Sequence, residues 1–375
     1  MLRAAAAALS TMSLACTAAP ATASPGGKPP IVLGTSGEFS GQAVAKENID
    51  GALAYFASIN KRGGVFGRNI ELKVYDDARD TRRTVENTDR LITEDKAFAL
   101  FGYRSTPSVE AALPILTRDR VPLIAPFSGA DSIRVPNSLV FHLRASYRQE
   151  AAKLVHQLST IGVHKIALLY QDDAFGKDAL AGFEEALRRE GLAPLATAKY
   201  DRKDLNVAGA VESIGQASPD AVLMACSPKA CIDFIKSMRS AKRRCQFLTL
   251  SNVNSDEFAQ GLGSDTRGVV VSQVMPSPWS QIIPLAREYR QAIMDSGSSV
   301  PVSYSSFEGF VAAKLVVTAL RLAGSDPTRE RFMAALESMH ELDLGGLTVR
   351  FFAKDHRGSN FVDLTLIGRG GKYIR

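Results

Sequence analysis

The fold is decided by the stretch Asn60-Lys61-Arg62-Gly63-Gly64-Val65-Phe66-Gly67-Arg68-Asn69-Ile70-Glu71-Leu72. Its three glycines end a helical pattern that begins near residue 44. A period-two alternation of apolar and polar residues follows over residues 70–75 and predicts a β-strand. A helix that gives way so quickly to a strand is typical of a chain in which helices cover a parallel sheet.

The same alternation extends in both directions along the chain. In the first part it predicts strands at 31–34, 70–75, 97–103 and 121–126, and helices at 44–60, 85–93 and 108–119. The pattern restarts at Lys165, with strands at 166–170, 193–200, 221–225, 247–250 and 268–274, and helices at 178–189, 207–217 and 230–241. Three helices, at 282–295, 307–323 and 329–339, then precede strand-like segments at 347–352 and 361–367. The sequence therefore predicts an α/β protein with two Rossmann-like lobes, each a parallel sheet flanked by helices.

Length and composition agree with two folded lobes. A chain of 375 residues exceeds what one hydrophobic core usually holds, and 45% hydrophobic with 22% charged residues is typical of globular proteins. The net charge of +6 is mild, since 45 basic residues face 39 acidic ones. The dense basic cluster at 239–244 lacks the aromatic residues of a nucleic-acid site. We expect a monomer that binds no nucleic acid.

The N-terminus has the parts of a secretory signal peptide. Arg3 precedes an Ala/Leu-rich run, and Ala21-Thr22-Ala23 forms an Ala-x-Ala cleavage site. Residues 1–23 are therefore predicted to be removed, residues 24–30 to form a flexible segment, and the mature chain to reach the periplasm. A lipid anchor at Cys16 is the alternative, although Ser13 departs from the lipobox pattern. No later segment offers 18 uninterrupted apolar residues.

Three cysteines follow the signal peptide, and their spacing does not indicate a metal site. Cys226 and Cys231 are too far apart for a thioredoxin-type motif or a zinc knuckle, and no histidine lies nearby in the sequence. One disulfide with one free thiol, or three buried thiols including Cys245, both remain open. We expect no metal.

No motif of a known enzyme or cofactor class is present. The glycine-rich stretches match neither dinucleotide nor P-loop fingerprints, and the five histidines are widely spaced. We expect no cofactor and no catalysis. The adjacent carboxylates Asp172 and Asp173 leave one enzyme alternative, a secreted hydrolase with an acid–base pair. A helix cap or a pocket rim is the other interpretation of this pair.

Polar residues gather where the predicted strands end, which is where open parallel sheets bind ligands. Four such ends carry small hydroxyl residues or glycines, at 36–41, 102–107, 125–131 and 170–176. In the second, Thr106 is predicted to be the N-cap of a helix with Pro107 at its first position. Ser105, Thr106 and nearby amides would then be free to receive a carboxylate.

Several short motifs, in this order and spacing, carry a family resemblance. They are the Ser-Gly turn after the first strand, the stretch 60–72, Asp76-Asp77, Leu113-Pro114, Val121-Pro122, residues 172–176, and Gln273-Val274-Met275-Pro276. With them the chain resembles the periplasmic solute-binding proteins of branched-chain amino acid ABC importers, the leucine/isoleucine/valine-binding protein family with the type I periplasmic-binding fold. The resemblance implies a three-crossover hinge near residues 143–147, 271–275 and 345–349. Lobe 1 would comprise residues 31–144 plus 276–346, and lobe 2 residues 145–275 plus 347–375.

The resemblance also implies where a ligand lies. The ligand carboxylate would contact the Ser105/Thr106 loop and the loop of Ser128, Gly129 and Ala130. Phe175 would cover the ligand from the side of lobe 2. Tyr147 is placed either in the cleft or at the hinge. Asn252 stands where amino-acid binders carry an acidic residue for the ligand ammonium, so Asp173 would have to substitute for it. Arg104 is either a clamp that suits an organic acid or a solvent-exposed residue.

Together these features predict a binding protein. It would close on a small carboxylated solute, either an amino acid or a related organic acid, and deliver it to the membrane permease and ATPase subunits of an ABC importer. A ligand-sensing module that a receptor reads is the alternative within the binding class. The sequence leaves open the identity of the ligand, its affinity and the recognition of an α-amino group.

Overall fold

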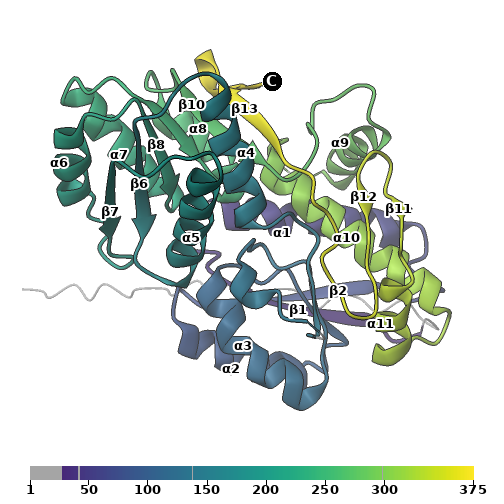
Figure 1. Ribbon diagram of the computed structural model, residues 1–375. Helices are drawn as coiled ribbons and strands as arrows, with labels where there is room; N and C mark the ends of the chain where they lie inside the picture. The colour runs from purple at the N-terminus through teal and green to yellow at the C-terminus, as the bar shows by residue number, and fades with distance from the viewer. Residues whose placement is uncertain (1–27, 41–42, 137, 298) are drawn as a thin grey trace, which may run out of the picture.

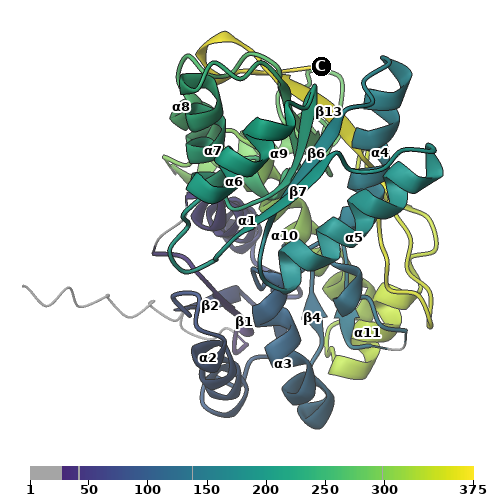
Figure 2. The same ribbon diagram turned by 60° about the vertical axis from the view of Figure 1, so that its left-hand side comes forward.

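Two sheets, one in each lobe, organise the chain, and the lobes meet along a broad seam (Figures 1 and 2). The computed structural model describes residues 28–40, 43–136, 138–297 and 299–375. The predicted signal peptide at 1–23, Cys16 and residues 24–27 lie outside these ranges. The two predicted α/β lobes with parallel sheets flanked by helices are confirmed.

Lobe 1 contains a five-stranded parallel sheet in the order β2-β1-β3-β4-β5. Its strands are β1 (Ile31–Gly37), β2 (Ile70–Asp76), β3 (Ala99–Phe101), β4 (Leu123–Ile124) and β5 (Val140–Phe141). The helices of this lobe are α1 (Ala43–Lys61), α2 (Thr81–Thr93), α3 (Thr106–Asp119), α9 (Pro284–Ser296), α10 (Tyr304–Ala323) and α11 (Arg329–Glu337). A short 3₁₀ turn, η1 (Asp131–Ile133), follows β4. The crossing from β5 to α4 leads into the second lobe.

Lobe 2 contains a seven-stranded sheet in the order β14-β13-β10-β9-β8-β6-β7. Its strands are β6 (Ile166–Gln171), β7 (Ala196–Tyr200), β8 (Ala221–Ala225), β9 (Gln246–Thr249), β10 (Val269–Gln273), β13 (Asp363–Ile367) and β14 (Tyr373–Ile374). Strand β13 runs antiparallel to its two neighbours, β10 and β14, and the other pairs are parallel. The helical segments are α4 (Tyr147–Thr160), α5 (Ala174–Arg189), α6 (Ala208–Ala217), α7 (Pro228–Ser240), η2 (Ser251–Val253), α8 (Asp256–Leu262) and η3 (Arg369–Gly371). The chain returns to lobe 1 between β10 and α9.

Glycines let helices α1 and α10 pack closely in lobe 1. A Cβ atom on Gly51 would lie 1.8 Å from the Ser306 carbonyl oxygen, and one on Gly309 would lie 1.7 Å from the Asn48 carbonyl oxygen. Any larger residue at either position would force the two helices apart. This packing brings Asn48 on α1 to the seam between the lobes, where it contacts the candidate site.

The third crossover comes later in the chain than the sequence predicted. Residues 347–352 were expected to be a strand of lobe 2, but β12 (Thr348–Val349) pairs only with β11 (Leu342–Asp343) in a short antiparallel hairpin. Phe351 is buried in the core of lobe 1, with its ring 5.8 Å from that of Phe141. The Gly358 amide then donates to the His142 carbonyl at 2.7 Å. The apolar contact of Phe351 thus keeps this segment on lobe 1 until the approach to β13.

The three cysteines within the described residues form one disulfide and one free thiol. Cys226, at the end of β8, is bonded to Cys231 in α7, and both are fully buried. Burial raises the pKa of the free Cys245 thiol to about 11. Within the four described ranges, no group of three or more His, Cys, Asp or Glu side chains is arranged to hold a metal ion. In the same ranges, no helix is long and apolar enough to cross a membrane.

Candidate ligand-binding site

A cavity lies between the lobes at the carboxyl ends of the parallel strands of both sheets. The space between its lining atoms amounts to about 590 Å³, part of it open to solvent. In each sheet the strand order reverses next to it, at β2-β1-β3 and at β7-β6-β8, which is where open α/β sheets bind ligands. Its lining residues are Glu38, Asp77, Arg79, Arg104, Ser105, Thr106, Phe127, Tyr147, Gln171, Asp173, Phe175, Arg202, Ser227, Pro228 and Asn252.

The start of helix α3 forms part of the lobe 1 wall. Ser105, not Thr106, is the N-cap, because its φ of 75° turns its hydroxyl toward the helix, where it accepts from the Ser108 amide. The sequence therefore placed the cap one residue too late. Thr106 is freed from capping, and its hydroxyl lies 2.9 Å from that of Ser128.

Arg104 is a lining cation without a directly bonded carboxylate in the described part of the chain, although the charges of Glu308 and Glu38 act on it from farther away. Its guanidinium donates to the Asn48 side-chain oxygen and to the Asn252 carbonyl oxygen, both at 3.1 Å, and it forms no ion pair within the described residues. Burial lowers the pKa of Arg104 from its ordinary value, but a guanidinium stays charged in proteins. A desolvated cation held only by neutral acceptors favours an anion beside it.

The other charged groups of the cavity already have partners. Arg79 donates to Glu38 at 2.6 Å, and Arg202 lies 3.4 Å from Asp173. Asp77 is buried and accepts the hydroxyls of Thr84 and Ser108 at 2.9 and 3.1 Å. Burial raises the pKa of Asp77, which weakens it as a counter-charge.

On the lobe 2 wall, Asp173 serves as the N-cap of α5. It accepts from the Gly176 amide at 3.1 Å and from the Gln171 side chain at 2.7 Å. Its neighbour Asp172 is bonded to Lys199 at 2.7 Å and to Lys177 at 3.1 Å, and these bonds lower the pKa of Asp172. The two carboxylates thus have separate cationic partners and do not share a proton, so this pair does not resemble an acid–base couple.

Two aromatic rings and one amide complete the cavity. Phe175 and Tyr147 are buried, with ring centroids 5.1 Å apart in an edge-to-face arrangement. Asn252 donates to the Cys226 carbonyl at 2.9 Å, but its buried side-chain oxygen has no hydrogen-bond partner among the described residues. An orphaned buried acceptor indicates that a ligand group with an N–H or O–H would bind there.

Of the residues that the sequence singled out, Arg104, Ser105, Thr106, Tyr147, Asp173, Phe175 and Asn252 line the cavity. Ser128, Gly129 and Ala130 do not. Ser128 lies behind Thr106, Gly129 accepts the Tyr147 amide at 2.8 Å, and Ala130 is fully buried. Eight lining residues were not predicted as ligand contacts, namely Glu38, Asp77, Arg79, Phe127, Gln171, Arg202, Ser227 and Pro228. Five of these, Asp77, Arg79, Arg202, Ser227 and Pro228, follow β2, β7 and β8, strand ends that are not among the four singled out in the sequence.

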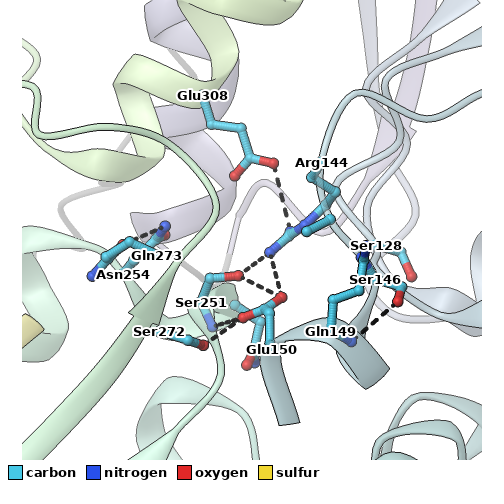
Figure 3. A network of polar contacts seen from close by, with 12 residues as sticks. Ser128, Arg144, Ser146, Gln149, Glu150, Ser251, Asn254, Ser272, Gln273 and Glu308 are labelled. Carbon is cyan, nitrogen blue, oxygen red and sulfur yellow. Dashed lines mark hydrogen bonds and ion pairs between the residues drawn. The ribbon is translucent and has the colours of Figure 1, made fainter. Parts of the chain in front are cut away.

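Behind the cavity, a buried polar network joins the lobes (Figure 3). Arg144, on the first crossover, lies 3.5 Å from Glu150 of α4 and 3.6 Å from Glu308 of α10, and it also donates to Ser251. Glu150 accepts the Ser251 amide and the Ser272 hydroxyl at 2.8 and 2.5 Å. The network therefore connects α10 of lobe 1 with three elements of lobe 2.

The placement of Thr106 and Ser128 gives a prediction. Thr106→Ala should weaken ligand binding by about two- to tenfold, the usual value of one neutral hydrogen bond. Ser128→Ala should weaken it less, because Ser128 does not line the cavity and supports the lining residues Thr106 and Tyr147 from behind. Calorimetric titration of both variants measures the difference. A larger loss for Ser128→Ala would place the ligand at Ser128 instead.

The fold and the cavity define a class, the two-lobed α/β binding proteins that hold a small molecule between their lobes. The chain belongs to the periplasmic binding protein family, whose model matches residues 30–372. It is similar to a substrate-binding periplasmic protein from Ralstonia solanacearum, with 34% identity, a TM-score of 0.86, and 92% of this chain and 99% of that chain covered.

The names of two further relatives refer to leucine/isoleucine/valine-binding proteins. A possible leucine/isoleucine/valine-binding protein from Rhodopirellula baltica is 29% identical, with a TM-score of 0.88 and coverage of 94% of this chain and 98% of that one. Leu/Ile/Val-binding protein homolog 7 of Brucella suis is 23% identical over 333 residues, which is 84% of this chain and 81% of the relative. The predicted family is thereby confirmed.

Proposed function

We propose that this protein is the periplasmic solute-binding component of an ABC importer, and that it captures a small carboxylate in the cleft between its lobes. The Arg104 guanidinium carries this proposal, since it faces the cavity, its hydrogen bonds go to neutral oxygens, and no carboxylate of the described residues lies within ion-pair distance of it. A carboxylate beside Arg104 would restore charge balance and accept charge-assisted hydrogen bonds. The closed, loaded form would then deliver the solute to permease and ATPase subunits in the membrane.

We further propose that the solute lacks an α-ammonium group. Asp173 is the lobe 2 carboxylate of the cavity, and Arg202 and the cap of α5 already use it. The free acceptor on that side is the neutral Asn252 side-chain oxygen, which suits a hydroxyl or amide donor. The fold itself does not decide, because proteins of this fold from Thermus thermophilus and Rhodopseudomonas palustris, at 18% and 20% identity, were crystallised with valine and with benzoate.

A thermal-shift screen tests the ligand class. The panel comprises leucine, phenylalanine and their deaminated counterparts, 4-methylpentanoate and 3-phenylpropanoate, with 2-hydroxy acids of the same carbon skeletons. A ligand at 100 times its Kd stabilises the folded protein by about 2.7 kcal/mol, which is readily measured as a shift in Tm. We expect shifts with deaminated or hydroxy acids and none with the amino acids.

The amides of the same acids are the matched controls. An amide keeps the shape of the acid but removes the charge that Arg104 would bind, so it should give no shift. A shift with leucine or phenylalanine would contradict the absence of an ammonium site. Equal shifts with an acid and its amide would contradict the role of Arg104.

A further inference from the structure

Helices α1 and α8, from opposite lobes, meet at the seam with each N-terminus held by a glutamate of the other helix. Glu257 of α8 accepts the amide of Ala43, the first residue of α1, at 3.2 Å. In return, Glu47 of α1 accepts the amide of Asp256, the first residue of α8. Glu47 also accepts the Ser303 hydroxyl at 2.5 Å. In the ribbon views, α1 is the lobe 1 helix that faces the second lobe (Figures 1 and 2).

We call this pair of contacts the cross-lobe clasp, formed by Glu47, Asp256, Glu257 and the Ala43 amide. Among the described residues, the clasp contains several carboxylates and no cation that balances them. Glu47 is 5% exposed and forms no ion pair with a cation in the described part of the chain, and the α8 side contributes two further carboxylates. The clasp is therefore a place where a negative charge is buried against like charges.

The other elements around Glu47 supply no compensating cation. Helix α9 presents the Tyr289 hydroxyl, and its Arg290 guanidinium is occupied by the carbonyl oxygens of residues 278 and 280. The C-terminal strand β14 presents Tyr373, whose pKa is raised by burial and by Glu47 and Asp256. On α1 itself, Lys46 is bonded to Asp50 at 2.6 Å and is exposed. Burial, followed by the charges of Asp256 and Glu257, raises the pKa of Glu47 to about 7.

We propose that the clasp links closure of the cleft to uptake of one proton by Glu47, so that the lobes separate more readily as the pH rises toward neutrality. In the closed form the buried carboxyl is favoured when protonated. In the open form α8 leaves, water reaches Glu47, and its pKa returns toward the ordinary value of 4.5. The sign follows from linkage: the closed state holds the proton more tightly, so lowering the pH favours closure.

The link to ligand capture rests on the proposed function, in which closure retains the solute. Between the two pKa values, closure takes up about one proton, so the closed fraction and the ligand affinity should fall by up to about tenfold per pH unit. Above the pKa of the closed state the carboxyl is ionised in both forms, and the dependence ends. A protein with this device would retain its solute better on the acidic side of neutrality.

The chain contains its own reporter of the clasp. Trp279 is the single tryptophan, and it lies on the second crossover. Its ring is stacked 6.2 Å from Tyr373 and lies 5.5 Å from Tyr304. The Tyr373 hydroxyl in turn donates to the carbonyl of Ser255, the N-cap of α8, at 3.1 Å. Movement of α8 away from α1 should therefore change the emission of Trp279.

The test follows Trp279 emission of the unliganded protein from pH 5 to pH 9, with small-angle scattering at the two ends of the range. We expect one transition with a midpoint near pH 7, and a larger radius of gyration at high pH. Glu47→Gln, which keeps the hydrogen bonds but not the charge, should abolish both changes. Glu94→Gln, at the end of exposed helix α2, is the matched control and should behave as the native protein.

A second variant covers the case in which Glu47→Gln folds poorly. Asp256→Asn removes a like charge from beside Glu47, so the midpoint should move to lower pH. An unchanged emission across the range, or a transition that persists in Glu47→Gln, would overturn the proposal. A transition without any change in the radius of gyration would show that Glu47 titrates without separation of the lobes, and it too would overturn the proposal. Since none of these measurements uses a ligand, their failure is distinct from failure of the carboxylate proposal.

Discussion

Replacing Arg104 with glutamine is expected to weaken binding of the carboxylate ligand by roughly 30-fold or more. Truncating one partner of a buried, hydrogen-bonded charge pair costs about 2 to 5 kcal/mol, and the ligand carboxylate would lose the one unmatched cation of the cavity. The Tm of the unliganded protein should change little or rise slightly, because the variant removes a desolvated charge that has no carboxylate partner. Calorimetric titration with the best acid of the screening panel, together with unliganded melting curves, measures both effects.

Arg104→Lys is the matched control for this substitution. Lysine keeps the charge but loses the planar guanidinium that reaches both Asn48 and Asn252. The affinity of Arg104→Lys for the carboxylate should therefore lie between those of the native protein and Arg104→Gln. A native affinity in Arg104→Gln would show that the carboxylate is held elsewhere, most simply by the α3 amides. A loss of affinity that is equal for the acid and its amide would indicate a structural role.

Much of the fold could be predicted because the spacing of apolar residues along the sequence reflects which side chains are buried. The alternation of short apolar strands with amphipathic helices is encoded locally, and the strands of the two sheets follow it except for the two-residue strands β5 and β14, which were not predicted. The third crossover could not be found this way. Residues 347–352 look like a strand locally, and only the distant contact of Phe351 with Phe141 shows that they stay on lobe 1.

The candidate site was predictable where one strand end supplied the signal. Ser105 and Thr106 follow directly from the hydroxyl residues at such an end, whereas Phe175 was placed by the family resemblance. The charge balance was not predictable, because each ion pair joins separate segments, such as Arg79 with Glu38 and Arg202 with Asp173. Which arginine is left unmatched depends on all of these pairs at once, and only the three-dimensional arrangement shows it.

The buried network behind the cavity should control stability more than any residue that lines the cavity. Arg144 and Glu150 are almost completely inaccessible, and Glu308 is 3% exposed. Glu150 is satisfied by several donors, whereas Glu308 has only the ion pair with Arg144 among the described residues. Burial raises the pKa of Glu308, and the Arg144 guanidinium opposes this shift. Arg144 thus compensates two carboxylates, one from each lobe.

Replacing Arg144 with methionine is therefore expected to destabilise the protein by about 3 to 5 kcal/mol, since breaking a buried ion pair leaves uncompensated charges. Urea denaturation at pH 7.5 measures the free energy of unfolding. The loss should shrink as the pH is lowered toward 5. A buried carboxyl whose pKa is raised in the folded state takes up a proton there, so its penalty applies above that pKa and disappears below it.

Glu308→Gln separates this electrostatic cause from simple loss of packing. Alone it should cost little, because no donor in the described residues depends on Glu308 except Arg144. Combined with Arg144→Met, it should recover part of the lost stability at pH 7.5, since one of the two stranded charges is gone. If the double variant is less stable than Arg144→Met, and the loss in Arg144→Met is the same at pH 5 and 7.5, then Arg144 stabilises the seam by packing and not by charge. Recovery that depends on pH would instead establish the network as the electrostatic link between the two lobes.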